Sequence, residues 1–497
     1  MSEIEYGHHI SYKNILKIII VYLLIFLPVV FVRYPDIRNE IKYFIVTDNM
    51  IESKNYFILK YFSELYPDKP PLYFWLLSFL KEHFSKYFVP LAVLFGSTIP
   101  SLLLTILSYS LFAKMRNEKT GFLIALSLCT IPFFIGTSVF LRMDILMTFF
   151  IVFALYKFFF MYYGCAERNL FNLITMYLSI ALAILTKGPA GAAVPICTIL
   201  TFLLLEKNMK FLKEIHFIKG IMLVLGIMAL WLYAIYLQPE GKEYISLLLG
   251  QETIGRVVKS KTHIQPVYYY LERIPLIMFP YGILFIGSLV YYIKNIKSYS
   301  KWDELEKIGF AWTVIPFILF SLASGKLEIY LIPMFPGMIA MVYAFIFKTQ
   351  DTKANNILIK ISMILLVFPL LFDKFFNKKK DFYKKLMCFP AGVITIFLFV
   401  SQGMKLYNSN FTLKPIVEII NSDNKNITAY RFPDFLNVTN IVGQSFENIS
   451  NTDELKNKLE DKDNMLIVGR TKYEKDLQNI PDLNFVYKNR TYCVYSK

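Results

Sequence analysis

Apolar runs long enough to cross a membrane recur along the first four-fifths of the chain. A helix needs about 17–25 mainly apolar residues to span roughly 30 Å of hydrocarbon. Only 18% of the 497 residues are charged, fewer than in soluble domains. We therefore predict a polytopic α-helical membrane protein of about 12–13 transmembrane helices. Spans are expected near 15–32, 88–113, 120–140, 145–163, 171–186, 189–205, 219–237, 268–293, 308–323, 327–347, 356–372 and 386–403.

The formal net charge of +16 comes largely from lysines in short loops, which orient helices and favour the cytoplasmic side. No compact basic domain stands apart from the spans, so we expect membrane lipids as partners and no nucleic acid. The basic loops 114–119, 206–219 and 294–301 are predicted to be cytoplasmic. The loops 33–87 and 238–267 then become external. The basic segment 374–385 conflicts with this alternation and leaves the side of the C-terminal tail open.

The chain divides into a transmembrane domain, 1–403, and a C-terminal soluble domain, 404–497. The tail has strand-like runs NITAYRF, NMLIVG, LNFVYKN and TYCVYSK and a helix-like DELKNKLED, which predict a small α/β domain. In the first external loop, two helices are predicted to lie in the membrane interface. One is within 33–50 and the other is the short apolar 70–84.

Several polar residues lie at the predicted external ends of the spans. Glu40, Tyr43 and Thr47 fall on one side of an amphipathic helix, unless 33–50 is a plain interfacial loop. Asp144 lies close to hydrocarbon, which is costly and suggests a function, although a self-neutralising pair with Arg142 is the alternative. Lys187 follows a span and would alone suit a snorkelling anchor.

Two later segments add to this face: 238–267, with Arg256 and His263, and ASGKLEIYLIP (323–333), with Lys326, Glu328 and Tyr330. Together these residues suit a site for a phosphorylated lipid and a sugar. Cations would bind the phosphate, an acid would serve as general base, and aromatic rings would line the path of the lipid tail.

An ordered set of motifs resembles the class C (GT-C) glycosyltransferases of families 39 and 83. These families include protein O-mannosyltransferases and bacterial lipid A aminoarabinose transferases. The set runs NEIKYFIVTDNM, DKPPLYFWL, RMDILMTFF, LTKGPAG, the 256–269 loop and SGKLEIYLIPMFP, and covers about residues 39–336. The resemblance implies the GT-C fold, a polyprenyl-phosphate sugar donor, an external active site and inverting transfer.

The resemblance also implies site residues. Family members carry an acidic pair in D-E-x-[RK]-Y, and Asn39 here replaces its first acid with an amide, which cannot accept a proton as a carboxylate does. The catalytic candidates are Glu40, Asp144 and, as a substitute, Asp36. The candidates for binding the donor phosphate are Lys69, Lys42, Arg256 and Lys326. The substrate pocket is expected to include Tyr43, Asn39, Tyr73, Lys187, His263, Tyr269 and Tyr330. No cofactor is required; Asp68 and His263 are candidate ligands for a divalent metal.

The partners implied are an undecaprenyl-type sugar donor and a lipid A, glycan or protein acceptor, at the plasma (inner) membrane of a bacterium. A lipid-linked sugar flippase or transporter, or an O-antigen ligase-like enzyme, is the alternative. A transporter would concentrate polar residues near the midplane of its spans, often in repeated halves. Here the candidates lie at span ends and no repeat is found, which favours the glycosyltransferase.

Overall fold

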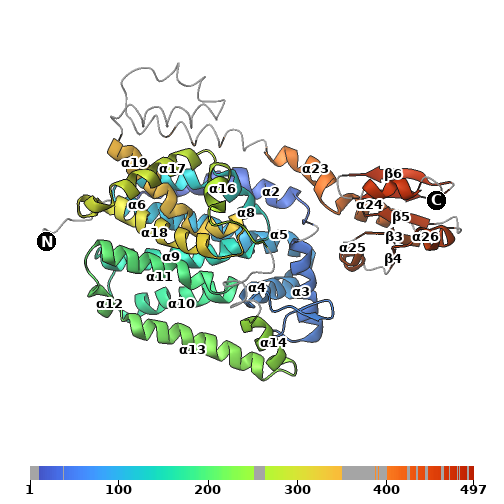
Figure 1. Cartoon of the computed structure of the whole chain (residues 1–497), viewed down its shortest axis with the longest axis horizontal. Helices are drawn as coiled ribbons and strands as arrows, with labels where there is room; N and C mark the ends of the chain where they lie inside the picture. Colours follow the sequence, from blue (N-terminus) through green and yellow to red (C-terminus); the bar gives the residue numbers. More distant parts are fainter. Residues whose placement is uncertain are drawn as a thin grey trace, which may run out of the picture.

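The computed structural model describes residues 10–36, 39–250 and 263–349, positions 387, 390 and 394, and most of 400–496. The gaps after residue 400 are 423–425, 433–434, 443–445, 460–463, 470, 478–479, 481 and 490–491. A helical body occupies one end of the long axis, and a small sheet domain occupies the other (Figure 1). The predicted span 356–372, and 11 of the 18 positions in 386–403, lie outside the described residues.

The helices of the body follow the apolar runs of the sequence. They are α1 (Tyr12–Val21), η1 (Tyr22–Phe26), α2 (Leu27–Val32), α3 (Glu40–Ser53), α4 (Leu72–Phe84), η2 (Ser85–Tyr87), α5 (Phe88–Val93), η3 (Leu94–Thr98), α6 (Ile99–Met115), α7 (Glu118–Leu128), α8 (Pro132–Val139), α9 (Met143–Tyr162), α10 (Leu170–Lys187), α11 (Ala190–Leu205), α12 (Phe211–Glu214), α13 (Phe217–Tyr236), α14 (Gly241–Leu247), α16 (Tyr269–Ile277), α17 (Gly282–Lys294), η5 (Ile296–Lys301), α18 (Glu304–Leu322), η6 (Glu328–Met334) and α19 (Phe335–Thr349).

Among the described residues, seven helices are long and apolar enough to cross a membrane, and a bent pair brings the number to eight. The seven are Tyr12–Val32, Leu72–Met115, Met143–Tyr162, Leu170–Lys187, Phe217–Tyr236, Glu304–Leu322 and Glu328–Thr349. The chain is therefore a multi-pass membrane protein. The α11 and α17 helices are apolar but shorter.

Three predicted spans differ in shape from a simple straight helix. The run 120–140 forms α7 and α8, which meet at 67° around a break before Pro132. The run 268–293 forms α16 and α17, separated at 278–281. The short helix predicted at 70–84 is α4, and it continues through 3₁₀ and π turns into α6, so it and the span 88–113 belong to one helical run of 44 residues.

Helix α3 is buried on two sides. Tyr43, Val46 and Met50 pack into the core of the helical body, whereas Ile41 and Ile45 pack into the core of the C-terminal domain. Glu40, Tyr43 and Thr47 are all buried, so the predicted face of α3 packs inside the protein and does not lie on the membrane surface. A short hairpin follows α3, formed by β1 (Lys60–Tyr61) and β2 (Glu64–Leu65).

The C-terminal domain is a mixed five-stranded sheet with the order β4-β3-β5-β7-β6, which confirms the predicted small α/β domain. Its strands are β3 (Asn426–Tyr430), β4 (Glu447–Ile449), β5 (Asn464–Val468), β6 (Asn484–Lys488) and β7 (Cys493–Ser496). The helices are α23 (Val400–Phe411), α24 (Lys414–Ser422), α25 (Phe435–Val442), α26 (Thr452–Lys458) and η7 (Thr471–Leu477). Strands β3, β4 and β5 run parallel, and β7 joins β5 and β6 antiparallel.

Candidate active site

Glu40 begins α3 and is buried, with 1% of its side chain exposed. Arg33, which follows α2, donates from Nη1 to Glu40 Oε2 at 2.8 Å and from Nη2 to Oε1. The backbone N–H groups of Asp36 and Leu141 donate to the same carboxylate. Arg33 Nε also donates to the Val139 carbonyl at 2.8 Å. Glu40 therefore ties the α2–α3 loop to the segment before α9, and these donors occupy both of its oxygens.

Asp144 lies in the first turn of α9 and is also 1% exposed. The ammonium of Lys187, the last residue of α10, donates to Oδ1. Arg142 Nε lies 3.5 Å from Oδ2, but within the described residues neither atom has a hydrogen-bond partner. A self-neutralising Arg142–Asp144 pair thus accounts for only part of this environment. The sequence motifs of α9 and α10 meet here, as predicted.

Tyr43 lies where the surroundings of the two acids meet. Burial raises the pKa of its hydroxyl; the positive charge of Arg142 opposes the rise, and Glu40, Tyr330 and Asp68 add to it. Such electrostatic influence requires short separations. Tyr43 is 7% exposed. Glu40 of α3, Arg142 just before α9 and Tyr330 of η6 therefore all act on one phenol group.

Two further aromatic side chains belong to this region. Lys187 Nζ lies 4.6 Å from the ring centroid of Tyr330, which links the Asp144 pair to η6. The Tyr73 ring packs edge-on against Tyr43 with centroids 5.9 Å apart, and it is fully buried. Tyr73 therefore supports Tyr43 from the protein core. We call the set Tyr43, Glu40, Arg142, Asp144, Lys187 and Tyr330 the Tyr43 centre.

Lys326 was predicted to bind phosphate, and the structure gives its ammonium two carbonyl partners. It is 2% exposed and donates to the carbonyls of Gln265, at 2.8 Å, and Ala323. Its backbone N–H donates to the His263 carbonyl at 2.9 Å. Burial lowers the pKa of Lys326. In this arrangement Lys326 fastens the segment after 262 to the end of α18.

Tyr269 belongs to a separate cluster of charged residues. Its hydroxyl donates to Glu328 Oε1 at 2.6 Å, and Arg273 Nε lies 3.6 Å from the same oxygen. Arg273 was missed in the sequence because a basic residue near the end of an apolar run is common. Arg33 was missed for the same reason.

The remaining predicted residues of the first loop lie at its edges. Asn39 donates from its backbone N–H, at 2.9 Å, and from Nδ2, at 3.2 Å, to Asp36 Oδ2. Lys42 Nζ lies 4.3 Å from the ring centroid of Tyr66, a cation–π contact. Lys69 and Asp68 are half-buried in the turn before α4.

Two predictions reach the limit of the described residues. Arg256 lies outside them. His263, the second candidate metal ligand, is exposed and has a positive φ of 57°. In the part of the chain that the structure describes, no three His, Cys, Asp or Glu side chains form a group suited to a metal. The metal site at Asp68 and His263 stays a prediction.

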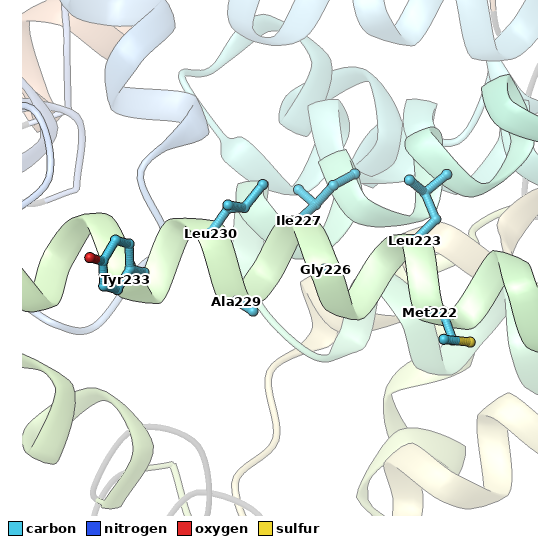
Figure 2. A pocket seen from close by; sticks show the side chains of 7 residues that line it. All are labelled: Met222, Leu223, Gly226, Ile227, Ala229, Leu230 and Tyr233. Atoms are coloured by element: carbon cyan, nitrogen blue, oxygen red, sulfur yellow. The ribbon is translucent and has the colours of Figure 1, made fainter.

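A hollow of about 590 Å³ lies on α13 and shares no lining residue with the Tyr43 centre. Figure 2 shows its lining, seven residues of this single helix: Met222, Leu223, Gly226, Ile227, Ala229, Leu230 and Tyr233. The lining is apolar except for one phenol. Its chemistry suits hydrocarbon chains and offers no group for acid–base catalysis.

The Tyr43 centre combines features needed for transfer from a phosphorylated donor. It has two buried carboxylates, one with an oxygen that no described donor satisfies, and two cations, Arg142 and Lys187; Arg33 adds a third beside Glu40. Cations fixed in a site that excludes water stabilise a developing phosphate charge more strongly than they would in water.

Comparison with known proteins agrees with this architecture. The family described as "Dolichyl-phosphate-mannose-protein mannosyltransferase" matches residues 68–233. The crystal structure of ArnT from Cupriavidus metallidurans bound to undecaprenyl phosphate superposes with a TM-score of 0.71 at 15% identity, covering 98% of each chain. The structural match shows that the chain has the fold of this solved transferase, and the sequence matches are to membrane glycosyltransferases, as the resemblance to the GT-C class implied.

Two curated relatives refine the comparison. An uncharacterised protein of Aquifex aeolicus is 26% identical over 365 residues, which are 72% of this chain and 70% of that protein. The undecaprenyl phosphate-alpha-4-amino-4-deoxy-L-arabinose arabinosyl transferase 2 of Proteus mirabilis is 25% identical over 314 residues, or 62% of this chain. This match spans only 54% of the Proteus enzyme.

Proposed function

We propose that this glycosyltransferase moves a sugar from a polyprenyl phosphate, of the undecaprenyl type, to an acceptor on the external face of a bacterial inner membrane. The acceptor is lipid A, another glycan or a protein. The observation that carries the proposal is the buried Asp144 carboxylate, which lies between Lys187 and Arg142. The relatives named as undecaprenyl-phosphate sugar transferases support the donor class.

The reaction we infer is a single displacement with inversion. An acceptor hydroxyl or phosphate oxygen attacks the anomeric carbon as the bond from that carbon to the donor phosphate oxygen breaks. A hydroxyl proton passes to Asp144 Oδ2, the oxygen without a hydrogen-bond donor among the described residues. The polyprenyl phosphate leaves with the electron pair, and Lys187 and Arg142 offset its negative charge.

The three predicted acids receive different roles in this proposal. Glu40 is saturated by Arg33 and two backbone N–H groups, so we assign it to positioning the α2–α3 loop. Asp36 is half-buried and accepts from Asn39, which makes it a second candidate for contact with the acceptor. We place Lys69 and Lys42 along the path of the donor phosphate, because Lys42 lies in the first turn of α3 and Lys69 lies in the turn before α4, which packs against α3.

The test has a cellular arm and a purified arm. Mass spectrometry of lipid A, surface glycans and secreted proteins, from cells with and without the gene, identifies the fraction that gains one sugar. In proteoliposomes, Asp144→Asn is expected to lower kcat by about 100-fold or more, within the range of a lost general base. The matched control is Asp48→Asn. Asp48 lies later in α3 than Glu40 and Tyr43, and it pairs with Lys81 of α4.

No mass difference in any fraction would contradict the proposed transfer. Wild-type turnover by the Asp144→Asn variant would contradict the assignment of the base while leaving the reaction class intact. An equal loss in both aspartate variants would point to folding, which thermal unfolding of each purified variant distinguishes.

A further inference from the structure

Helix α23, the first helix of the C-terminal domain, contacts the loop that carries Asp36 and leads into Glu40. Asn408 is 4% exposed, and its side-chain amide makes two hydrogen bonds to backbone groups more than 370 positions earlier in the chain. Oδ1 accepts from the Tyr34 N–H at 2.7 Å, and Nδ2 donates to the Val32 carbonyl at 2.8 Å. Val32 ends α2, so its carbonyl belongs to the terminal group that a helix cannot satisfy internally.

Further contacts continue this junction toward the Tyr43 centre. Asp36 and Thr412 form an isolated antiparallel bridge. The Tyr407 ring packs edge-on against Phe140, with centroids 5.5 Å apart, and Arg33 Cζ lies over the Phe140 ring, 4.4 Å from its centroid. Burial raises the pKa of Tyr407, and the charges of Asp36 and Glu40 add to the rise. Helix α23 is therefore within electrostatic reach of both acids.

The sheet domain in turn fixes the end of α23. The hydroxyl of Tyr487, on β6, and Nδ2 of Asn489 donate to the Ser409 carbonyl at 2.5 and 3.2 Å. The Tyr492 hydroxyl donates to the Thr412 carbonyl at 3.3 Å. The domain also packs its core against Ile41 and Ile45 of α3, as described above. Polar and apolar contacts thus join the domain to both ends of the α2–α3 loop.

We propose that Asn408 is a positioning residue for the transfer reaction, through which the C-terminal domain holds the α2–α3 loop in register with α9. The link runs from Asn408 to Val32 and Tyr34, then through the Arg33–Glu40 pair to the carbonyl of Val139 and the N–H of Leu141. Those residues directly precede Asp144. This inference rests on the proposed function, because a residue can position the site for a reaction only if that reaction occurs. It assigns the C-terminal domain a part in positioning the α2–α3 loop for catalysis.

The experiment uses the full chain in nanodiscs and compares Asn408→Ala with Asn410→Ala. Asn410 is the matched control because it lies on the same helix and, among the described residues, its Nδ2 donates only to Leu406 and Ser409 within that helix. Asn408→Asp is the second variant, since it keeps the acceptor for the Tyr34 N–H. Two quantities are measured: hydrogen exchange of the backbone across residues 32–47, and kcat and KM with a polyprenyl-phosphate sugar.

Asn408→Ala is expected to speed exchange in 32–47 and to lower kcat by about 10–100-fold, the scale of a small misplacement, with KM for the donor within about twofold. Asn408→Asp should fall between this variant and wild type, and Asn410→Ala should match wild type. Unchanged exchange, or faster exchange with wild-type kcat, would overturn the positioning role. Faster exchange in a protein whose wild type transfers no sugar would instead overturn the proposed function and leave the junction itself established.

Discussion

At the scale of single residues, the Arg33–Glu40 pair has the most definite energetic consequence. Both side chains are 1% exposed. A buried charge is tolerable only while its partner is present, because removing one partner leaves the other desolvated and unpaired. The pair therefore acts as a connector whose loss affects the whole α2–α3 loop.

Glu40→Gln is expected to lower the free energy of unfolding by about 3–5 kcal/mol, the usual cost of breaking a buried pair from one side. Arg33→Met combined with Glu40→Gln removes both charges and should recover part of that loss. Thermal unfolding in detergent measures both variants. The control is Glu240→Gln, which breaks the exposed pair with Lys60 and should cost no more than about 1 kcal/mol. Equal effects of Glu40→Gln and Glu240→Gln would contradict the connector role.

The sequence predicted the meeting of Asp144 and Lys187 because two motifs at the ends of neighbouring spans were expected on one face. It did not predict the Arg33–Glu40 pair, whose seven-residue separation crosses a loop rather than a helical turn. The role of Asn408 could not be predicted from the sequence, because its partners lie more than 370 positions earlier, at residues 32 and 34. The carbonyl partners of Lys326 were equally hidden, because backbone contacts between loops leave no mark on the pattern of charges.

At the scale of elements, the contact between α10 and α13 depends on one glycine. A Cβ at Gly220 would lie 2.0 Å from Tyr177 Cζ, whereas a Cβ at Gly226 of the same helix would meet nothing within 4 Å. Tyr177 is held in place because its hydroxyl donates to the Ile215 carbonyl at 2.9 Å. The two glycines of α13 therefore face different surroundings.

Gly220→Val is expected to lower the free energy of unfolding by about 1–3 kcal/mol or more, because the added methyl groups must push α13 away from α10. Gly226→Val is the matched control and should change stability by much less. Thermal unfolding of the two purified variants compares them directly. A Gly220→Val protein as stable as wild type would show that α13 does not pack on Tyr177 in the membrane.

The hairpin of β6 and β7 is joined to η7 by Glu474. Lys488 donates to Oε2 at 2.5 Å, and the Tyr495 hydroxyl and Cys493 thiol donate to Oε1 at 2.9 and 3.2 Å. The hydrogen bond from Lys488, with those from Cys493 and Tyr495, lowers the pKa of Glu474. A lowered pKa means that the folded domain binds the proton less well than the unfolded chain.

The stability contributed by Glu474 should therefore be present above its ordinary pKa of about 4.3 and lost as the pH falls through the lowered value. Between about pH 5 and pH 3, we expect the stability of the C-terminal domain to fall more steeply in the wild type than in the Glu474→Gln variant. The urea concentration at which buried Cys493 reacts with a dithiopyridine reagent measures this. Glu454→Gln, at an exposed position of α26, is the control and should follow wild type. Parallel curves for wild type and Glu474→Gln would refute the role of Glu474.

Elements were easier to predict than their details. Helices that bury apolar runs were found within a few residues, and four of the five strands of the C-terminal sheet were found from their apolar patterns. Strand β4 was missed because three residues are too few to show a period. The 67° bend between α7 and α8 was missed because Pro132 starts the second helix inside one continuous apolar run.

At the scale of the whole molecule, the packing of the C-terminal domain on α3 bears on a conflict that the loop charges left open. The domain core includes Ile41 and Ile45 of α3, so the domain lies on the side of the membrane where α3 lies (Figure 1). Alternation from the basic loops predicts that side to be external. The basic segment 374–385 would then be an exception to the charge rule, which is a bias in loop composition and not a strict law.

Single cysteines placed at three exposed positions can test this arrangement. Ser53→Cys at the end of α3 and Asp453→Cys, whose native side chain is 87% exposed on α26, should both react with a membrane-impermeant maleimide in intact cells. Lys210→Cys, in the basic loop 206–219, should react only after the cells are opened. The contact between domain and α3 requires positions 53 and 453 to label together, whichever side they face. Labelling of one without the other would therefore contradict the fold itself. Protection of both positions, with labelling of position 210 in intact cells, would reverse the predicted orientation of the protein in the membrane and place the Tyr43 centre in the cytoplasm.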